Sequence, residues 1–209
     1  MMTGLSLASL LQEIMEIVWN EKDIVTCRFS ALDRRLLKKT KHFFEDQYGI
    51  ESSYENPCGL FVHTSDHPTP EPPLCPSNVK LRSLTQKDAE LVNSRWQYRS
   101  NSSLPVVREM VGSKRSIGLE VDGKLISWAC QNLDGPMGML WTEEEYRRKG
   151  YGDLVIAEMM KVGNENNRAQ PWLAFIVDGN AASKSLFQKL KWERVADADW
   201  VGFTVNRQK

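Results

Sequence analysis

The residues best suited to chemistry lie in one stretch, residues 139–167, which reads MLWTEEEYRRKGYGDLVIAEMMKVGNENN. The stretch begins with an apolar run, which an acidic and then a basic cluster follow. Gly150 and Gly152 come next and predict a turn, and an apolar helix is expected after that turn. Glycines permit turn conformations that other residues avoid, and a helix leaves its first N–H groups unpaired. With the basic side chains and the helix dipole, those N–H groups favour a di- or triphosphate. Residues 147–152, called the glycine turn below, therefore predict an anion site, although an ordinary strand-to-helix turn has the same pattern.

The elements around the glycine turn predict a mixed α/β fold. Val155, Met159 and Val162 follow the turn at helical spacing, which places them on one face of a helix. Upstream, two apolar runs flank Asp-Gly at 122–123, a pair typical of a tight β-hairpin. Residues 79–209 read as strand, two helices, three strands, glycine turn, helix, strand, helix and strand. This order predicts a mixed sheet with helices on its faces.

A proline-rich segment marks the expected domain boundary. Residues 67–78 hold most of the prolines and predict an extended linker. Before it, residues 1–66 predict a smaller α/β region, which includes a helix over 30–48 with Ser30 as its N-cap. The basic side chains of that helix predict a solvated face. After the linker, residues 79–209 predict the main domain.

The composition argues against several classes of protein. The 27 basic residues balance 27 acidic ones, so no general basic field favours nucleic acid. No apolar run is long enough to cross a membrane, and no signal peptide is evident, which predicts a cytoplasmic protein and leaves a mitochondrial location open. The four cysteines form no Cys-x-x-Cys pair, and the sequence around His63 and His67, which Pro68 follows, favours a loop over a helical face. We therefore expect no metal.

The glycine turn and its neighbours resemble a known superfamily. The turn sequence RRKGYG is similar to Arg/Gln-x-x-Gly-x-Gly/Ala, the signature of the GNAT superfamily of N-acetyltransferases. The segments LTQKDAELVNSRW, GKLISWACQ and EEYRRKGYG, in this order, resemble the glycine N-acyltransferase-like branch of animals. FIVDGNAASKSLFQKLKW resembles the asparagine-led helix that follows the next strand in such folds. The resemblance extends from about Val79 to Phe203. It implies a GNAT fold, with the N-terminal region as a partial copy.

The resemblance also implies a cofactor and its contacts. Acetyl-CoA or another acyl-CoA would lie where two sheet strands splay, with its pyrophosphate on the N–H groups of the glycine turn and its pantetheine along the preceding strand. Asn180 resembles an asparagine that reaches the cofactor arm, and capping the next helix is its alternative role. The cofactor-binding residues implied are Leu140, Trp141, Thr142, Arg147, Arg148, Lys149, Gly150, Tyr151, Gly152, Asn180 and Phe187.

Acyl transfer to an amine requires a base, an oxyanion stabiliser and a proton donor for the thiolate. Glu145 matches the glutamate of the family's Pro-Glu-Tyr-Arg segment and is the first candidate base, with Glu143 the second. The alternative interpretation is a solvated acidic turn that pairs with nearby arginines. Ser127 and Trp128 match the family's Ser-Trp, and they predict either an acceptor pocket or hairpin core. Backbone N–H groups of the expected strand GMLW, residues 138–141, would hold the oxyanion.

One departure from the family keeps a second function open. Many relatives carry a tyrosine where this chain has Phe187, which cannot donate a proton. The leading prediction is an acyl-CoA-dependent N-acyltransferase that acts on a small amine or amino acid such as glycine. The alternatives are a catalytically degenerate acyl-CoA-binding module and a protein or peptide N-acetyltransferase. Oligomeric state is left open by the sequence.

Overall fold

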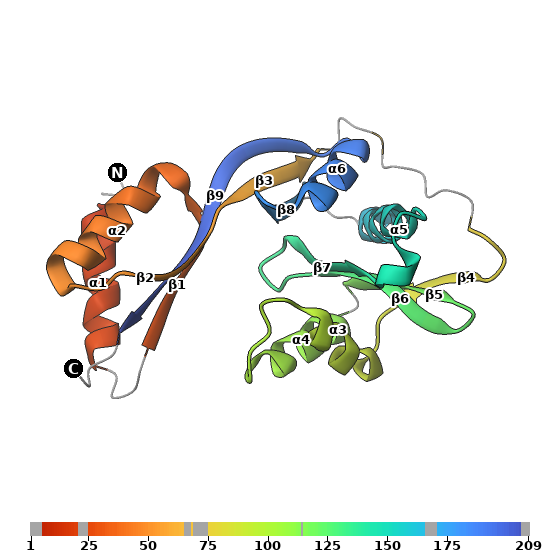
Figure 1. The fold of residues 1–209 in the computed structure, drawn as a ribbon, viewed down its shortest axis with the longest axis horizontal. Coiled ribbons are helices and arrows are strands. Elements are labelled where there is room, and N and C mark those ends of the chain that lie inside the picture. The colour runs from red at the N-terminus through yellow and green to blue at the C-terminus, as the bar shows by residue number, and fades with distance from the viewer. Residues whose placement is uncertain are drawn as a thin grey trace. The chain divides into compact units, whose positions relative to one another are not determined.

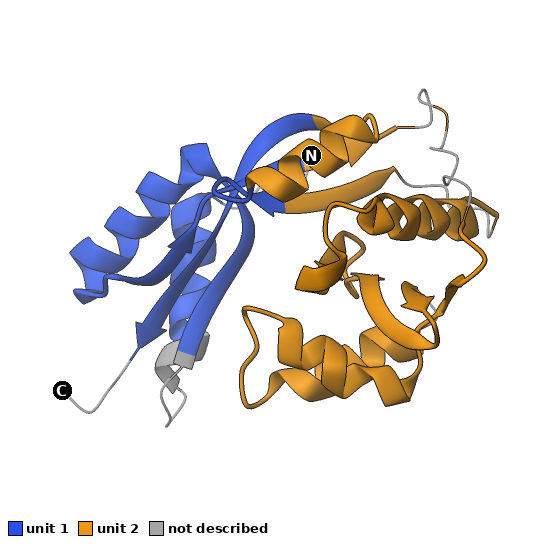
Figure 2. Ribbon diagram, turned by 45° about the vertical axis from the view of Figure 1, so that its right-hand side comes forward, with its two compact units in different colours: residues 1–60, 176–180, 194–209 blue, residues 61–175, 181–193 orange. Residues whose placement is uncertain are grey.

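A computed structural model of the chain describes residues 6–20, 25–64, 68, 75–113, 115–165 and 171–205. The chain forms two compact units, coloured separately in Figure 2. The N-terminal unit comprises residues 1–60, 176–180 and 194–209, and the central unit comprises 61–175 and 181–193. The units differ from the linear segments expected from the sequence because the last strand pairs with the first. Most of the proline-rich segment lies outside the described residues, and the boundaries at 66 and 79 stay a prediction.

The central unit contains a mixed sheet (Figure 1). Its strands are β4 (Val79–Ser83), β5 (Ser116–Val121), β6 (Lys124–Gln131), β7 (Met137–Thr142) and β8 (Trp172–Val177), of which β8 ends in the N-terminal unit. Neighbours from β4 to β7 run antiparallel, with Leu81 opposite Leu119 and Trp128 opposite Trp141. β8 pairs with β7 in parallel. The predicted mixed α/β class is therefore confirmed.

The predicted hairpin joins β5 and β6. Asp122 and Gly123 have φ values of 50° and 79°, as the two central residues of a type I′ turn require. This turn has the twist of its flanking strands, so Val121 and Lys124 pair directly. Lys124 is therefore exposed at the end of the hairpin, directly after its turn.

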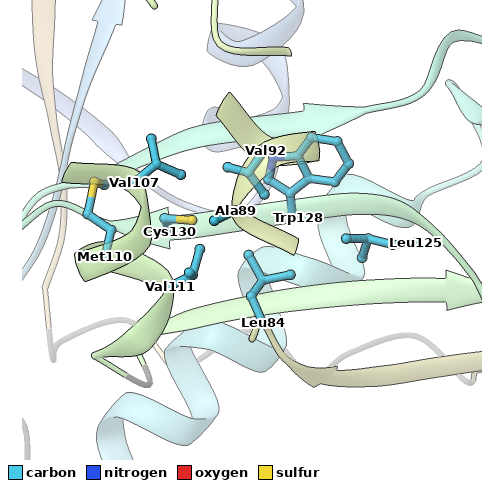
Figure 3. Packing of buried hydrophobic residues seen from close by; sticks show 9 residues of the cluster. All are labelled: Leu84, Ala89, Val92, Val107, Met110, Val111, Leu125, Trp128 and Cys130. Carbon is cyan, nitrogen blue, oxygen red and sulfur yellow. The ribbon is translucent and has the colours of Figure 1, made fainter. Parts of the chain in front are cut away.

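Helices cover both faces of this sheet (Figure 1). On one face lie α3 (Ala89–Arg95) and α4 (Ser103–Gly112); on the other lies α5 (Tyr151–Glu165). The chain enters α3 through a 3₁₀ turn, Gln86–Asp88, where the backbone N–H of Thr85 donates to Asp88 Oδ2 at 2.7 Å, as in a capping box. Figure 3 shows the core beneath α3 and α4. It consists of Leu84, Ala89, Val92, Val107, Met110, Val111, Leu125, Trp128 and Cys130.

The N-terminal unit has its own core. It contains α1 (Leu7–Asn20), β1 (Val25–Asp33), α2 (Arg34–Tyr48), β2 (Ser52–Asn56), the start of β3 (Cys58–His63) and nearly all of β9 (Glu193–Val205). β9 pairs antiparallel with both β1 and β2. Phe44 of α2 stacks on Phe203 of β9 with ring centroids 4.0 Å apart, and Leu11 and Met15 of α1 are buried in the same cluster.

The start of α2 differs from the sequence prediction. Asp33, not Ser30, caps the helix, and its Oδ1 accepts from the backbone N–H of Arg35 at 2.8 Å. The reason is that β1 continues through an irregular register between Phe29 and Leu32, so Ser30 is still part of the strand. The helix ends at Tyr48, as predicted, and Gly49 follows with a left-handed φ of 64°.

An ion network around the buried carboxylate of Asp199 joins α2 to β9. The side chain of Asp199 is 2% exposed and receives Arg34 Nε at 2.9 Å and Arg34 Nη2 at 2.8 Å. Arg34 Nη2 also reaches Asp178, and these carboxylates, Asp199 first, raise the pKa of the guanidinium. The hydrogen bond from Arg194, followed by that from Arg34, lowers the pKa of Asp178. Arg34 is therefore a structural residue of this unit rather than part of a solvated basic face.

Candidate functional site

The glycine turn connects β7 to α5 through a short 3₁₀ turn, Glu144–Tyr146. The backbone N–H of Glu143 donates to Ile126 O at 2.8 Å, which ties the end of β7 to β6. Arg148 and Gly150 then adopt positive φ values of 59° and 80°. The first helical hydrogen bond runs from Leu154 N to Gly150 O at 3.1 Å. The N–H groups of the first helical turn consequently point out of its N-terminus without helical acceptors.

Close packing explains the glycine at position 152. A Cβ there would lie 3.1 Å from Leu186 Cδ2 of α6 (Ala181–Lys189) and 4.0 Å from Thr142 Oγ1. The same helix supplies Lys189, whose ammonium pairs with the buried carboxylate of Asp153. Without that cation, Asp153 would place a negative charge in the first turn of α5 and oppose an incoming anion. α6 thus packs against the glycine turn through Leu186 and neutralises the charge of Asp153 through Lys189.

The edge of β7 next to the turn is open toward β8. Within the described part of the central unit, the register between the two parallel strands contains one pair, Met137 with Ala174. Met139 has a positive φ of 51°, and the β6–β7 register shifts between Trp128 and Cys130, so β7 bends there. Leu140, Trp141 and Thr142 follow and are partly exposed. A strand edge that departs from its neighbour can pair with the amide groups of an extended ligand.

The basic side chains around the turn fall into two groups. Arg147 is turned back onto β7, where its guanidinium carbon lies 5.0 Å from the ring centroid of Trp141 and its Nε donates to Thr142 O at 3.0 Å. Arg148 and Lys149 are exposed. Lys124, which sequence reasoning missed, comes from the β5–β6 hairpin. No sequence signal linked it to the turn because only sheet pairing brings the two together.

The three glutamates occupy different environments. Glu145, the first candidate base, is exposed, as is Glu144. The side chain of Glu143 is only 18% exposed, and its Oε1 accepts from Arg95 Nε of α3 at 2.9 Å. The expected pairing of an acidic turn with nearby arginines is present in part, since Arg147 lies 3.5 Å from Glu144. Arg95 was missed because α3 is distant in the sequence.

The two acceptor-pocket candidates lie in the core. Ser127 and Trp128 have no exposed surface. The hydroxyl of Ser127 donates to Trp141 O at 2.8 Å and lies 2.8 Å from Thr142 Oγ1, so it fixes the end of β7. Trp128 belongs to the buried cluster of Figure 3, where it lies beside Val92 of α3. In this structure the hairpin-core alternative therefore describes both side chains.

The remaining candidates lie at the two ends of α6. Phe187 is 3% exposed and packs edge-to-face on Trp192, with ring centroids 4.8 Å apart and an interplanar angle of 82°. Asn180 directly precedes the helix, is exposed, and belongs to the N-terminal unit. Its backbone N–H donates to Val177 O at 2.9 Å. The role of Asn180 toward a cofactor stays a prediction.

Comparison with known proteins agrees with this geometry. Residues 116–201, which include the glycine turn, match the FR47-like protein family. A solved structure of a Drosophila protein has a TM-score of 0.80 at 22% identity, covering 94% of this chain and 66% of that one. A GCN5-related N-acetyltransferase from Kribbella flavida has a TM-score of 0.61 at 15% identity, covering 94% of this chain and 75% of that one. The chain has the GNAT fold.

The GNAT fold covers both compact units. A tandem GNAT protein from the clavulanic acid biosynthesis pathway also matches 94% of this chain, with a TM-score of 0.59 at 16% identity. In sequence, the human glycine N-acyltransferase-like protein 1B is 28% identical over 119 residues, which are 56% of this chain. This chain spans 39% of the human protein. This match supports the resemblance to the glycine N-acyltransferase-like branch over about half of this chain.

Two further observations bear on the class of site. Among the described residues, no three His, Cys, Asp or Glu side chains are grouped to hold a metal ion. No helix in the described ranges is long and apolar enough to cross a membrane.

Proposed function

We propose that this chain is an acyl-CoA-dependent N-acyltransferase that moves an acetyl or larger acyl group to the amine of a small molecule or amino acid such as glycine. The observation that carries the proposal is the open edge of β7, which is followed, after one 3₁₀ turn, by the glycine turn and the N-terminus of α5. An extended amide chain that ends in a diphosphate matches this order of groups, strand edge first and anion cradle second. The name of the human relative favours glycine among the acceptors.

The residues fit the two halves of such a cofactor. Leu140, Trp141 and Thr142 would pair through their backbone with the amide arm, while the N–H groups from Arg148 to Gly152 would hold the diphosphate. When bound, the cofactor supplies a thioester carbonyl that an amine can attack. Backbone N–H groups at the bend of β7 would stabilise the oxyanion, since they are oriented before the reaction begins. Glu145 or Glu143 would accept the proton of the amine, directly or through water.

The cradle is tested by replacing Gly152 with glutamate. The added carboxylate introduces both bulk and negative charge in the first turn of α5, so we expect acetyl-CoA affinity to fall at least about 100-fold. Isothermal titration with acetyl-CoA and benzoyl-CoA measures the effect. Gly152→Ala is the matched control, because its Cβ makes the same 3.1 Å approach to Leu186 without charge. If wild-type protein binds neither ester, the proposal is wrong.

The base is tested by comparing three neutral variants of the acidic turn. We expect Glu145→Gln to lower kcat about 100-fold with little change in KM for acyl-CoA, as loss of a general base does. Glu144→Gln is the exposed control and should retain activity. Thiol release against a panel of amines reports the rates. A large loss in Glu143→Gln alone would transfer the role to Glu143 and to its partner Arg95.

The degenerate binding module is the second candidate. Phe187 favours it, because this buried phenyl ring occupies the position of a proton-donating tyrosine and has no group to donate. Acyl-CoA binding without thiol release toward any amine would identify that function. A peptide acceptor is distinguished by the same panel when N-terminal peptides are included. We further propose the cytoplasm as the compartment, and imaging of the tagged chain tests this.

A further inference from the structure

One ion pair at the end of β7 contains a cation to which the proposed function gives no contact with a substrate. Arg95, the last residue of α3, donates from Nε to Oε1 of Glu143 at 2.9 Å. Glu143 directly follows β7, and both residues belong to the central unit. α3 and α5 cover opposite faces of the sheet (Figure 1). The guanidinium therefore comes from the face opposite the helix that follows the glycine turn.

The guanidinium of Arg95 keeps capacity for further hydrogen bonds. Within the described ranges it bonds through Nε alone, and neither of its Nη groups has a partner. Arg34 and Arg82, by contrast, bond carboxylates through all three of their nitrogens. The side chain of Arg95 is 43% exposed, so a solute can reach it. The two Nη groups of a guanidinium match the two oxygens of a carboxylate.

The ion pair offers both charges to a single small molecule. The carboxylate of Glu143 is held beside the guanidinium and is 18% exposed. A free α-amino acid carries an ammonium and a carboxylate on one carbon, so it can lie antiparallel to the pair and satisfy both charges. A simple amine would meet the same carboxylate, but the adjacent cation would repel it. The amine of a peptide N-terminus also has no carboxylate on its carbon.

We infer that Arg95 selects the acceptor: its Nη groups bind the carboxylate of a free α-amino acid, while Glu143 binds the ammonium. The inference rests on the proposed function, because it places the acceptor amine beside one of the two candidate bases. It narrows that function, because simple amines and peptide N-termini become poor acceptors. It also separates acceptor binding from the anion cradle at the N-terminus of α5.

The exposure of Arg95 sets the expected size of the effect. Hydrogen bonds between charged groups stabilise more than neutral ones, and solvent screening reduces this gain at a partly exposed site. We therefore expect loss of the guanidinium to raise KM for an amino acid by about tenfold to thirtyfold. The contact is the same in the ground state and the transition state, so kcat should change little. The effect should weaken as salt is raised.

The test compares each amino acid with its amide, in which a neutral group replaces the carboxylate. Thiol release from saturating acetyl-CoA gives kcat and KM for the common α-amino acids and for the matching amides. The proteins compared are wild type, Arg95→Met and Arg95→Lys. Arg99→Met is the control, since Arg99 is an exposed arginine whose Nη1 donates to Ser94 O at 3.0 Å. The change in the ratio of acid to amide is used, because the intrinsic reactivities of the two amines then cancel.

The expected result is selective for the carboxylate. Arg95→Met should raise KM for the amino acid and leave KM for the amide within about twofold of wild type. Arg95→Lys should recover part of the loss, because an ammonium keeps the charge but not the planar pair of donors. Arg99→Met should match wild type. The affinity for acetyl-CoA, measured by titration calorimetry, should be the same in all four proteins.

Each other outcome overturns the inference in a distinguishable way. Equal losses toward acids and amides would assign Arg95 to the orientation of Glu143 or to the fold, and a selective loss of acetyl-CoA affinity would assign it to the cofactor. An unchanged KM in Arg95→Met would remove its contact with the acceptor. A best acceptor without a carboxylate beside its amine would leave the acyltransferase intact and the inference wrong. Absence of thiol release with every amine would overturn the proposed function as well.

Discussion

Replacing Arg34 by methionine is expected to lower the free energy of unfolding by about 2–4 kcal/mol. The variant leaves the carboxylate of Asp199, 2% exposed, without its bidentate partner. One hydrogen bond remains, from Cys58 N at 3.2 Å, and it cannot replace a full charge. We discount the upper end of the usual range for a broken buried pair because the Arg34 side chain is itself 36% exposed. Urea unfolding of the full chain measures the change.

The control for this prediction lies in the same network. Asp197 also pairs with Arg34, at 3.0 Å, but its side chain is 47% exposed. Asp197→Asn should therefore cost less than about 1 kcal/mol. If the two variants had equal effects, surface charge rather than the buried carboxylate would account for the loss. If Arg34→Met retained wild-type stability, Asp199 would not depend on this cation.

Truncating Trp128 to alanine should cost about 3–5 kcal/mol, as expected for a fully buried aromatic residue. The indole has no exposed surface and lies beside Val92 of α3 in the core cluster (Figure 3). The cluster around it is built from residues of helices and strands, including Val92 of α3, and such elements limit the collapse of a cavity. Thermal or urea unfolding measures the change in the free energy of unfolding. The signal that is followed must come from a group other than this indole.

The matched variant Trp128→Phe decides between the two roles considered for this residue. A core residue replaced by a smaller aromatic ring should lose part of the stability and leave KM for the amine unchanged. A residue of the acceptor pocket should instead change KM for the amine at nearly constant stability. A selective KM effect would return Trp128 to the acceptor site.

Local signals explain what was correct at the level of elements. The Asp-Gly pair at 122–123 demands two positive φ values, and the structure has them. Gly49 follows the last residue of α2 in the left-handed conformation, which glycine adopts more readily than other residues. Thr85 and Asp88 form their capping interaction within a few residues. Each feature depends on backbone geometry that neighbouring residues set, so no tertiary information is needed.

The cap of α2 marks the limit of such signals. Ser30 and Asp33 both suit an N-cap, and the choice between them depends on where β1 ends. β9, from the other end of the chain, pairs with β1 as far as Asp33. That pairing extends the strand past Ser30, and the helix begins later. Long-range strand pairing therefore decided a question that local preference left open.

The sequence by itself determined the mixed α/β class, the hairpin and the glycine turn with its helix, because these follow from local backbone preferences and periodic burial. Only the tertiary structure decided which side chains meet there. It brought Lys124 and Lys189 to the turn, paired Glu143 with Arg95, and buried Trp128. Charge and burial at a site depend on segments far apart in the chain, so a motif of six residues does not predict them.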